Sequence, residues 1–302
     1  MLLQFVVQNY ASIKDEVILS FEPSSDQEHP ENILSKGKYK AGGITAIYGA
    51  NASGKTNVYK AMTMALVILR SSNIRQINDQ IPTVPFKFNT ESVSSPSRFE
   101  FTFVANDGKK YIYGFSADQY KVHEEYLYRY NTSRPALVFD RKGAEYKFAR
   151  SERRFLDPLV RMNTENKLFL ATATTWNVES TTIPYRWLAE GIDAYTNDEN
   201  LTNIALNMYR TDQEANIKFT AKLLRQADIN ISDIQGESNR IDNPQGAPLL
   251  GGIIIAGQLI QPKEQYEIKI TTGHLIEEAE GKEKMFSLSL GEESLGTQQL
   301  FF

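Results

Sequence analysis

A glycine-rich stretch near residue 50 has the residue types that bind phosphate groups. The run from Gly49 to Thr56 reads GANASGKT and matches the phosphate-loop motif G-x-x-x-x-G-K-[ST] at every fixed position. In such a loop, successive backbone N–H groups and a helix N-terminus surround the phosphate oxygens. The lysine reaches the β- and γ-phosphates of a nucleotide, and the Ser/Thr hydroxyl binds Mg²⁺. With Thr56 as the metal ligand, the motif predicts nucleotide contacts from Gly49, Ala50, Asn51, Ala52, Ser53, Gly54, Lys55, Thr56 and Asn57.

A phosphate loop must lie between a strand and a helix, and the flanking sequence has both patterns. The apolar run from Ile44 to Gly49 predicts a short strand that leads into the loop. From Thr56 onward, apolar residues at helical spacing predict a helix with one buried face. The alternative is a chance glycine-rich turn, and the agreement between motif and context favours the phosphate loop. The predicted buried face consists of Val58, Met62, Ala65, Leu66 and Leu69.

The rest of the chain predicts a mixed α/β protein in three parts. Residues 1–150 form a lobe with the phosphate loop and a β-rich subdomain, residues 151–230 a helical insertion, and residues 231–302 a return to the first lobe. The alternating strands near residue 100 are rich in aromatics, which favours a half-buried antiparallel sheet over a base-stacking platform. Strands are expected at 2–7, 16–21, 98–105, 109–117, 124–130, 135–149, 251–260 and 266–276, helices within 151–177, 183–195 and 216–229, and a polar loop at 22–43.

Composition excludes several classes of protein. The chain has 302 residues and no cysteine, which excludes disulfides and cysteine-ligated zinc. Its formal net charge of -4 provides no global basic field that would attract nucleic acid. The N-terminus lacks the pattern of a secretory signal, and no apolar run is long enough to span a bilayer. We therefore expect a cytoplasmic protein without a membrane partner.

Three motifs together narrow the class of nucleotide-binding protein. They are FVVQNYASIKD at residues 5–15, the phosphate loop followed by Asn57, and ESLGTQQLF at residues 293–301. With ENKLFLATA at residues 165–173, these segments resemble ABC-type ATPases of the RecF and SMC class. Within that class the chain is similar to the stand-alone AAA-family ATPases of prokaryotic defence loci, relatives of the OLD-family (overcoming lysogenisation defect) ATPases. The expected fold is a P-loop ABC-type ATPase head with an antiparallel β-rich lobe and a helical insertion.

The resemblance implies that ATP, bound with Mg²⁺, joins two subunits. In that class, the signature of one subunit binds the γ-phosphate held in the phosphate loop of the other. Ser294 would supply a hydroxyl, Gly296 would let the backbone approach, and the residues after them would begin a helix that faces the phosphate. The trans signature thus comprises Ser294, Gly296 and Thr297. The alternative is an ordinary helix start with Ser294 as its N-cap.

The resemblance also implies a Walker B strand, in which four apolar residues precede an Asp-Glu pair shortly after the signature. The 302 residues contain no such run, so no catalytic residue is assigned. We expect the chain to be part of a longer ATPase that hydrolyses ATP, and we expect little turnover from these residues alone.

The resemblance suggests an ATPase that regulates a partner effector, a nuclease or toxin, in anti-phage defence. One alternative is a DNA-repair or chromosome-maintenance ATPase that clamps DNA. A long heptad coiled coil would favour chromosome maintenance, and none is visible between the motifs. Another alternative is a scaffold that ATP stabilises with negligible turnover.

Three further groups of polar residues have structural alternatives. Arginines 150, 153, 154 and 161 could contact nucleic acid or a partner, although a solvated helix face paired with Glu152 and Asp157 is favoured. His274 is expected to be structural or to lie at a subunit face. Glu124 and Glu125 lack metal-binding partners at suitable spacing.

Overall fold

The computed structural model describes residues 1–24, 29–193, 213–226, 231–241, 253–255, 258–260, 265–278 and 282–301. The chain divides into two compact units, residues 1–194 and residues 195–302. Each unit has a hydrophobic core of its own. We call the first the sheet unit and the second the signature unit, and each is described by itself.

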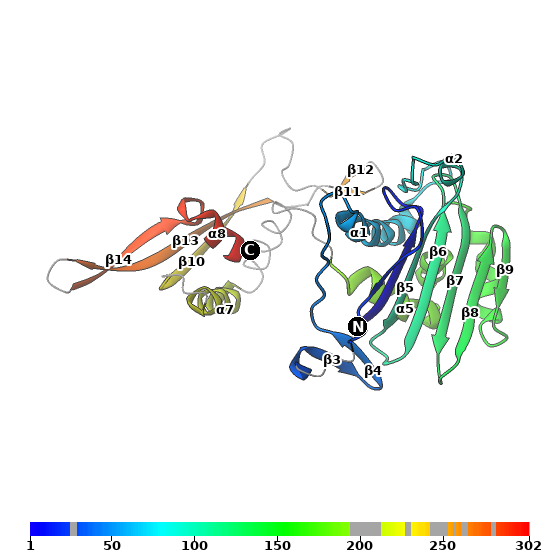
Figure 1. Cartoon of the computed structure of the whole chain (residues 1–302), viewed down its shortest axis with the longest axis horizontal. Helices are drawn as coiled ribbons and strands as arrows, with labels where there is room; N and C mark the ends of the chain where they lie inside the picture. Colours follow the sequence, from blue (N-terminus) through cyan, green and yellow to red (C-terminus); the bar gives the residue numbers. More distant parts are fainter. Residues whose placement is uncertain are drawn as a thin grey trace. The chain divides into compact units, whose positions relative to one another are not determined.

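The sheet unit is built on one antiparallel sheet of seven strands. These are β1 (Leu2–Gln8), β2 (Val17–Ser20), β5 (Ser97–Val104), β6 (Lys110–Ala117), β7 (Val122–Tyr130), β8 (Pro135–Lys142) and β9 (Glu145–Phe148). Their order is β2-β1-β5-β6-β7-β8-β9, and Figure 1 labels β5 to β9. The predicted hairpins are confirmed, and the β5–β6 turn contains Gly108 at φ +76°, a left-handed conformation that favours glycine.

Aromatic side chains of the strands form the core of this unit. Phe99, Phe101 and Phe103 alternate along β5 with partly exposed residues and are at most 1% exposed. The ring centroids of Phe5 and Phe101 lie 4.9 Å apart. The prediction of a half-buried sheet is confirmed here, because these buried rings are not available to stack nucleic-acid bases.

Helices and short helical turns complete the sheet unit. They are η1 (Pro30–Asn32), α1 (Lys55–Ser71), η2 (Ser72–Ile74), α2 (Thr90–Val93), α3 (Arg153–Leu156), η3 (Asp157–Met162), α4 (Phe169–Thr175) and α5 (Glu179–Glu190). The predicted face of α1 is confirmed: Ala65, Leu66 and Leu69 are buried, and Val58 and Met62 pack against the core.

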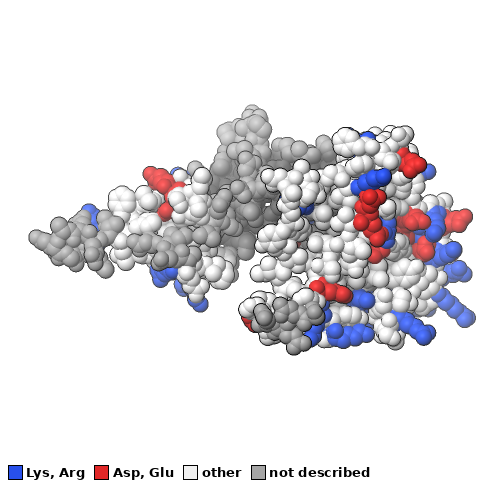
Figure 2. All heavy atoms as spheres, viewed as in Figure 1, with Lys and Arg blue, Asp and Glu red and all other residues white. Residues whose placement is uncertain are grey.

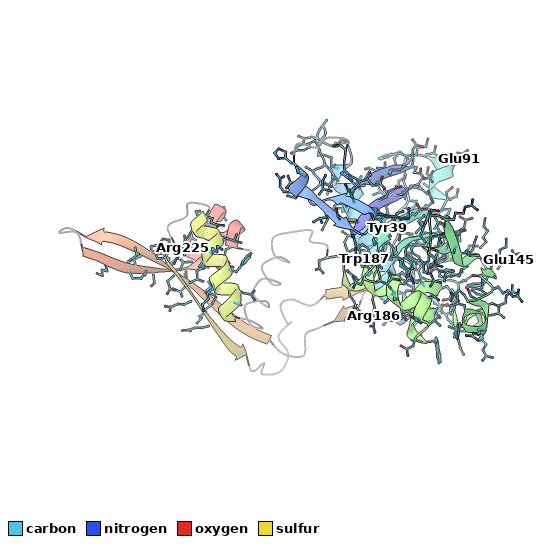
Figure 3. All side chains as sticks on the ribbon, turned by 90° about the horizontal axis from the view of Figure 1, so that it is seen from below. Tyr39, Glu91, Glu145, Arg186, Trp187 and Arg225 are labelled. Carbon is cyan, nitrogen blue, oxygen red and sulfur yellow. The ribbon has the colours of Figure 1, made fainter. Side chains whose placement is uncertain are left out.

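The C-terminal end of α1 is bonded to the C-terminal end of α5. Arg70 donates from Nε to Ala189 O at 2.8 Å and from Nη2 to Ile192 O. Trp187 of α5 stacks on Phe103 of the sheet, with ring centroids 4.4 Å apart (Figure 3). These contacts fix α5 both to the helix that follows the phosphate loop and to the sheet.

The helix expected within residues 151–177 is divided. It begins as α3, continues as the 3-10 helix η3, and returns to α-helix only at Phe169. Pro158 lies at the start of η3, and a proline has no N–H with which to continue the α-helical hydrogen bonds. The periodicity of the sequence therefore identified helical residues without showing where the helix is interrupted.

The polar loop expected over residues 22–43 contains a hairpin, so this prediction was wrong. Strands β3 (Ile33–Lys36) and β4 (Tyr39–Gly42) pair with each other, and Gly37 between them has φ +61°. Their sequences, ILSK and YKAG, have too few apolar residues to show the alternation from which a strand is predicted.

The signature unit contains a three-stranded antiparallel sheet with helices packed against it (Figure 1). Leu224, Ile234, Ile270 and Phe301 form its core. The strand expected over 251–260 is a hairpin instead, although residues 251–252 and 256–257 lie outside the described residues. The elements are α7 (Gln213–Gln226), β10 (Asp233–Ile241), β11 (Ile253–Ile255), β12 (Gln258–Ile260), β13 (Gln265–Glu278), β14 (Lys282–Ser289), η4 (Leu290–Glu292) and α8 (Leu295–Phe301).

Helix α7 is hydrogen-bonded to the segment that immediately precedes β10. Arg225 projects from its last turn and donates from Nε to Ile231 O at 3.3 Å (Figure 3). The helices expected within residues 151–230 are thus divided between the two units. Helices α3, α4 and α5 belong to the sheet unit, and α7 belongs to the signature unit.

Candidate nucleotide site

Residues 49–54 form an exposed loop that leads directly into α1. Gly54 is the N-cap of α1 and has φ +92°, a conformation that favours glycine. Lys55 is the first residue of the helix. Its Nζ donates to the carbonyl oxygens of Gly49 at 2.8 Å and Ala50 at 2.7 Å. The loop therefore holds the lysine ammonium group at its own centre.

The loop has the close packing and the free donors that an anion requires. A β-carbon on Gly49 would lie 3.0 Å from Ser53 Oγ, so a side chain there would require Ser53 to shift. In the first turn of α1, the N–H groups of Asn57 and Val58 donate to Gly54 O at 2.9 and 3.2 Å. Those of Lys55 and Thr56, at the start of the helix, have no intrahelical acceptor. Thr56 lies in that turn with an exposed side chain. The donor set of N–H groups, one ammonium and one hydroxyl fits a nucleotide phosphate with Mg²⁺.

The strand predicted over Ile44–Gly49 is absent from the structure. Residues 44–50 have no regular secondary structure, and Ile44 and Tyr48 are 87% and 89% exposed. A strand needs a neighbour whose backbone groups complete its hydrogen bonds. No strand among the described residues pairs with this segment. The sequence pattern is that of a strand, but the partner that would stabilise it is missing.

Ser12 is a residue of the loop site that the sequence did not identify. Its Oγ accepts a hydrogen bond from Asn57 Nδ2 at 2.6 Å, and a β-carbon on Gly54 would lie 3.3 Å from the same oxygen. The motif at residues 5–15 contained Ser12, but 45 residues separate it from Asn57. A contact at that separation becomes visible only in the fold.

Asn9 fixes the turn that carries Ser12. Its Nδ2 donates to Ser92 O at 2.8 Å and Ser95 O at 2.9 Å, and its Oδ1 accepts from Phe86 N at 3.0 Å. Asn9 itself has φ +54°, a conformation that asparagine adopts more readily than most residues. The asparagine of the N-terminal motif therefore positions the turn, and the serine contacts the phosphate loop.

The signature segment begins with a compact turn after β14. Ser289 and Glu292 form a capping box around η4, in which the Glu292 carboxylate accepts from Ser289 Oγ at 2.7 Å and Ser289 N at 2.8 Å. The bond from the Ser289 hydroxyl, followed by that from its N–H, lowers the pKa of Glu292 below its ordinary value. The turn is thus hydrogen-bonded on the surface, just before the predicted signature residues.

The signature residues differ in exposure. Ser294, Leu295 and Gly296 are exposed, and we call these three residues the signature tip. Ser294 Oγ accepts from Thr297 N at 3.1 Å, the geometry of an N-cap. Thr297 is only 8% exposed, and its hydroxyl lies 2.9 Å from Ser294 Oγ. A β-carbon on Gly296 would meet nothing closer than Ser294 Oγ at 3.8 Å, so the chain itself has room for a side chain there.

The ENKLFLATA segment packs inside the sheet unit. Asn166 is fully buried, and its Nδ2 donates to Gln76 O at 2.7 Å, Asp79 O at 2.9 Å and Ile77 O at 3.2 Å. The segment thereby fixes the chain that follows η2. Its asparagine is structural in this fold and does not belong to the loop site.

Glu125 is also structural, because its carboxylate is bonded to groups of the sheet unit itself. Its carboxylate accepts from Phe169 N at 2.5 Å and Leu170 N at 2.9 Å at the start of α4. Arg141 Nη1 lies 3.6 Å away. Burial raises the pKa of Glu125, and the Arg141 charge opposes that shift. The described residues contain no group of three or more His, Cys, Asp or Glu side chains that could hold a metal ion.

The arginines near residue 150 lie on the surface. The Arg154 guanidinium lies 4.3 Å from the centroid of the Phe155 ring, and both side chains are exposed. Glu152, which was expected to pair with these arginines, lies 3.4 Å from Arg129 instead. On the face shown in Figure 2, basic and acidic side chains of the sheet unit lie side by side. That face therefore presents no single-sign field for nucleic acid.

Within the described ranges, no helix combines the length and the apolar character needed to cross a bilayer.

A family model described as "AAA domain, putative AbiEii toxin, Type IV TA system" matches residues 44–302. The matched range includes the phosphate loop and the signature segment. No curated protein matches the chain. Because the family match covers most of the sequence, this protein belongs to that family of AAA-domain P-loop ATPases.

Proposed function

We propose that this protein binds ATP with Mg²⁺, assembles with a second copy around the nucleotide, and regulates a toxin or nuclease partner in anti-phage defence. The phosphate loop is the observation that carries the proposal. The ammonium group of Lys55 donates to Gly49 O and Ala50 O at 2.8 and 2.7 Å, and Gly54 has a φ of +92° that favours glycine. An ATP phosphate would replace these carbonyl oxygens as the partner of Lys55, with a stronger charge-assisted bond.

Mg²⁺ would bind at the Thr56 hydroxyl and neutralise charge on the β- and γ-phosphates. The side chain of Thr56 is exposed at the first turn of α1, next to Lys55. The residues of this chain would therefore bind and orient the nucleotide. Hydrolysis also needs acidic residues that hold the metal and orient water, and the 302 residues contain no four-residue apolar run closed by Asp-Glu. We expect slow turnover from these residues alone.

Assembly around ATP is supported by the exposure of the signature tip. Leu295 is 77% exposed, and Gly296 has open space where a side chain would project. Within the part of the chain that the structure describes, no contact requires glycine at residue 296, which fits a close approach by a second molecule. Ser294 can act as N-cap and phosphate ligand together, because a hydroxyl accepts with one lone pair and donates its own hydrogen.

The link to an effector rests on the family description, which names a toxin of a type IV toxin–antitoxin system. A partner protein, whether nuclease or toxin, would respond to the ATP-bound assembly. The formal net charge of -4 and the mixed charges in Figure 2 give no observation that favours a DNA clamp over this function.

The two parts of the proposal are tested by two experiments, and the first measures nucleotide binding at the loop. Lys55→Ala removes a charge-assisted contact, so ATP affinity should fall about tenfold to a hundredfold. Lys60→Ala is the matched control, because Lys60 is an exposed lysine of the same helix. Isothermal titration with ATP and Mg²⁺ measures both variants. Equal affinities for Lys55→Ala and Lys60→Ala would contradict binding at the loop.

The second part is tested with Ser294→Arg and Gly296→Ala. The first places a long side chain on the signature tip, and the second adds a β-carbon where a second molecule should approach. Light scattering with Mg²⁺ and the slowly hydrolysed analogue AMP-PNP measures oligomeric mass beside nucleotide binding. We expect both variants to bind the analogue and to lose the association. Unchanged association in both would reduce the tip to an ordinary helix start.

A further inference from the structure

Glu293 connects the signature tip to the sheet of its unit. Its carboxylate is 8% exposed and accepts hydrogen bonds from two side chains of β13. His274 Nε2 lies 2.7 Å from Oε1, and Thr272 Oγ1 donates to the same oxygen. An ionised carboxylate can only accept, so the contact places the imidazole proton on Nε2. Glu293 immediately precedes Ser294, the first residue of the tip.

The two donors share one face of β13 because two positions separate them along a strand. Gly273 between them allows side chains of both neighbouring strands to approach β13 closely. A β-carbon there would lie 2.9 Å from Met285 Sδ of β14 and 3.1 Å from Asp233 Cβ of β10. Thr272 is itself fully buried, and Gly273 pairs with Asp233 and Ser287. The sheet therefore presents the hydroxyl and the imidazole to Glu293 from a close-packed support.

The main chain of the same segment is also hydrogen-bonded. Gln298 of α8 donates from Nε2 to Glu293 O at 2.8 Å and to Gly291 O at 3.4 Å. Glu293 is thus bonded through its side chain to β13 and through its carbonyl to α8. The exposed tip begins at the next residue, so any displacement of Glu293 moves Ser294 with it.

We propose that His274 and Thr272 are positioning residues for the trans signature, acting through Glu293. They touch no nucleotide. They hold the tip in the one conformation that can meet the phosphate loop of a second copy. This inference rests on the proposed ATP-dependent assembly and assigns to β13 the task of orienting the surface by which two copies join.

The test replaces His274 by glutamine or by asparagine, whose side chains end in an amide group. His274→Gln carries its amide N–H₂ near the position of Nε2 and can still donate to Glu293. His274→Asn carries the same group one methylene shorter, near the position of Nδ1, and cannot reach. Self-association with AMP-PNP and Mg²⁺ is measured by analytical ultracentrifugation, and analogue affinity of the dilute chain by titration. Ser294→Arg is measured beside them, with thermal melting of every variant.

We expect His274→Asn to weaken self-association about tenfold or more, as the loss of a hydrogen bond to a charged group would, and His274→Gln to retain it. Affinity for the analogue should be the same in both. Wild-type association in His274→Asn, with association lost in Ser294→Arg, would overturn this inference and leave the proposed assembly standing. If His274→Asn and Ser294→Arg both associate as the wild type does, this inference and the proposed assembly are overturned together. Equal loss in the two amide variants with a lower melting temperature would assign His274 to the folding of its unit and also overturn the inference.

Discussion

Glu125 and Glu293 perform related tasks in the two units, and their surroundings differ. Each joins the start of a helix to a strand. Glu125 extends from β7 to two N–H groups of α4, and its side chain is fully buried beside Arg141. Glu293 extends from the residue before Ser294 back to His274 and Thr272 on β13, and the three residues that follow it are exposed.

The hydrogen bonds of Glu125 stabilise the core of the sheet unit, whereas those of Glu293 orient an exposed segment. Loss of Glu125 leaves a buried guanidinium without its counter-charge, so the consequence is a less stable unit. Loss of the bonds to Glu293 releases a short exposed segment, so the consequence falls on what that segment contacts. Stability and assembly should therefore respond to different glutamates.

The largest effect is expected from Glu125→Ala. Removing one partner of a buried ion pair costs about 3–5 kcal/mol in the free energy of unfolding. Both tryptophans, Trp176 and Trp187, lie in the sheet unit. Their fluorescence during urea unfolding therefore reports on this unit alone.

Two control variants are measured by the same urea unfolding. Glu124→Ala removes a half-exposed glutamate of the same strand, 3.3 Å from Lys142, and should cost about 0–1 kcal/mol. Glu293→Gln lies in the signature unit and should leave the tryptophan transition unchanged. A shift with Glu293→Gln as large as that with Glu125→Ala would break the comparison between the two glutamates.

Asn166→Ala should give the next largest effect. The substitution leaves the carbonyl oxygens of Gln76, Ile77 and Asp79 without the donor that now satisfies them. Loss of buried partners costs about 1–3 kcal/mol. Asn166→Asp should cost more, because it turns a carboxylate oxygen toward three carbonyls. Tryptophan-detected urea unfolding checks both, and a smaller cost for aspartate than for alanine would contradict this account of Asn166.

A smaller effect is expected where the N-terminal motif meets the phosphate loop. Ser12→Ala and Asn57→Ala each remove the 2.6 Å hydrogen bond between them. A double-mutant cycle on the free energy of unfolding should give a coupling of about 0.5–1.5 kcal/mol. A coupling of zero would mean that the contact does not connect the two segments energetically.

Some features of the fold and of the loop site could be predicted from the sequence alone. The β5–β6 hairpin was predictable, because aromatic alternation and the Asn106-Asp107-Gly108 turn are local signals. The phosphate loop was predictable for the same reason, since glycine, lysine and threonine lie within eight residues. The face of α1 followed from its spacing.

Other features depended on contacts that the sequence does not record. The segment from Ile44 has a strand pattern, but a strand requires a partner, and the pattern says nothing about one. Ser12 and Asn57 are 45 residues apart, and Glu125 and Leu170 are also 45 apart. His274 was expected to be structural or at a subunit face, and only the fold showed that it contacts Glu293.

The smallest effect concerns Glu292, in the turn before the signature tip. Its folded-state pKa is lowered by hydrogen bonds from Ser289, so its contribution to stability is present above the unfolded-state pKa and is lost as the pH falls through the folded-state pKa. NMR titration should find a lower pKa for Glu292 than for glutamate in an unfolded peptide. Ser289→Ala should return it toward the ordinary value, and an unchanged pKa in that variant would show that Ser289 is not the cause.

The bond from Arg70 to the end of α5 has a mechanical consequence. Helix α1 has 17 residues, and its rise of about 1.5 Å per residue gives a stiff rod about 25 Å long. One end of the rod is the lysine of the phosphate loop. The other end is fastened to Ala189 and Ile192, the last stretch before the chain leaves the sheet unit at residue 194. We therefore expect a displacement of the phosphate loop to move Ala189 and Ile192 through the helix and the Arg70 hydrogen bonds.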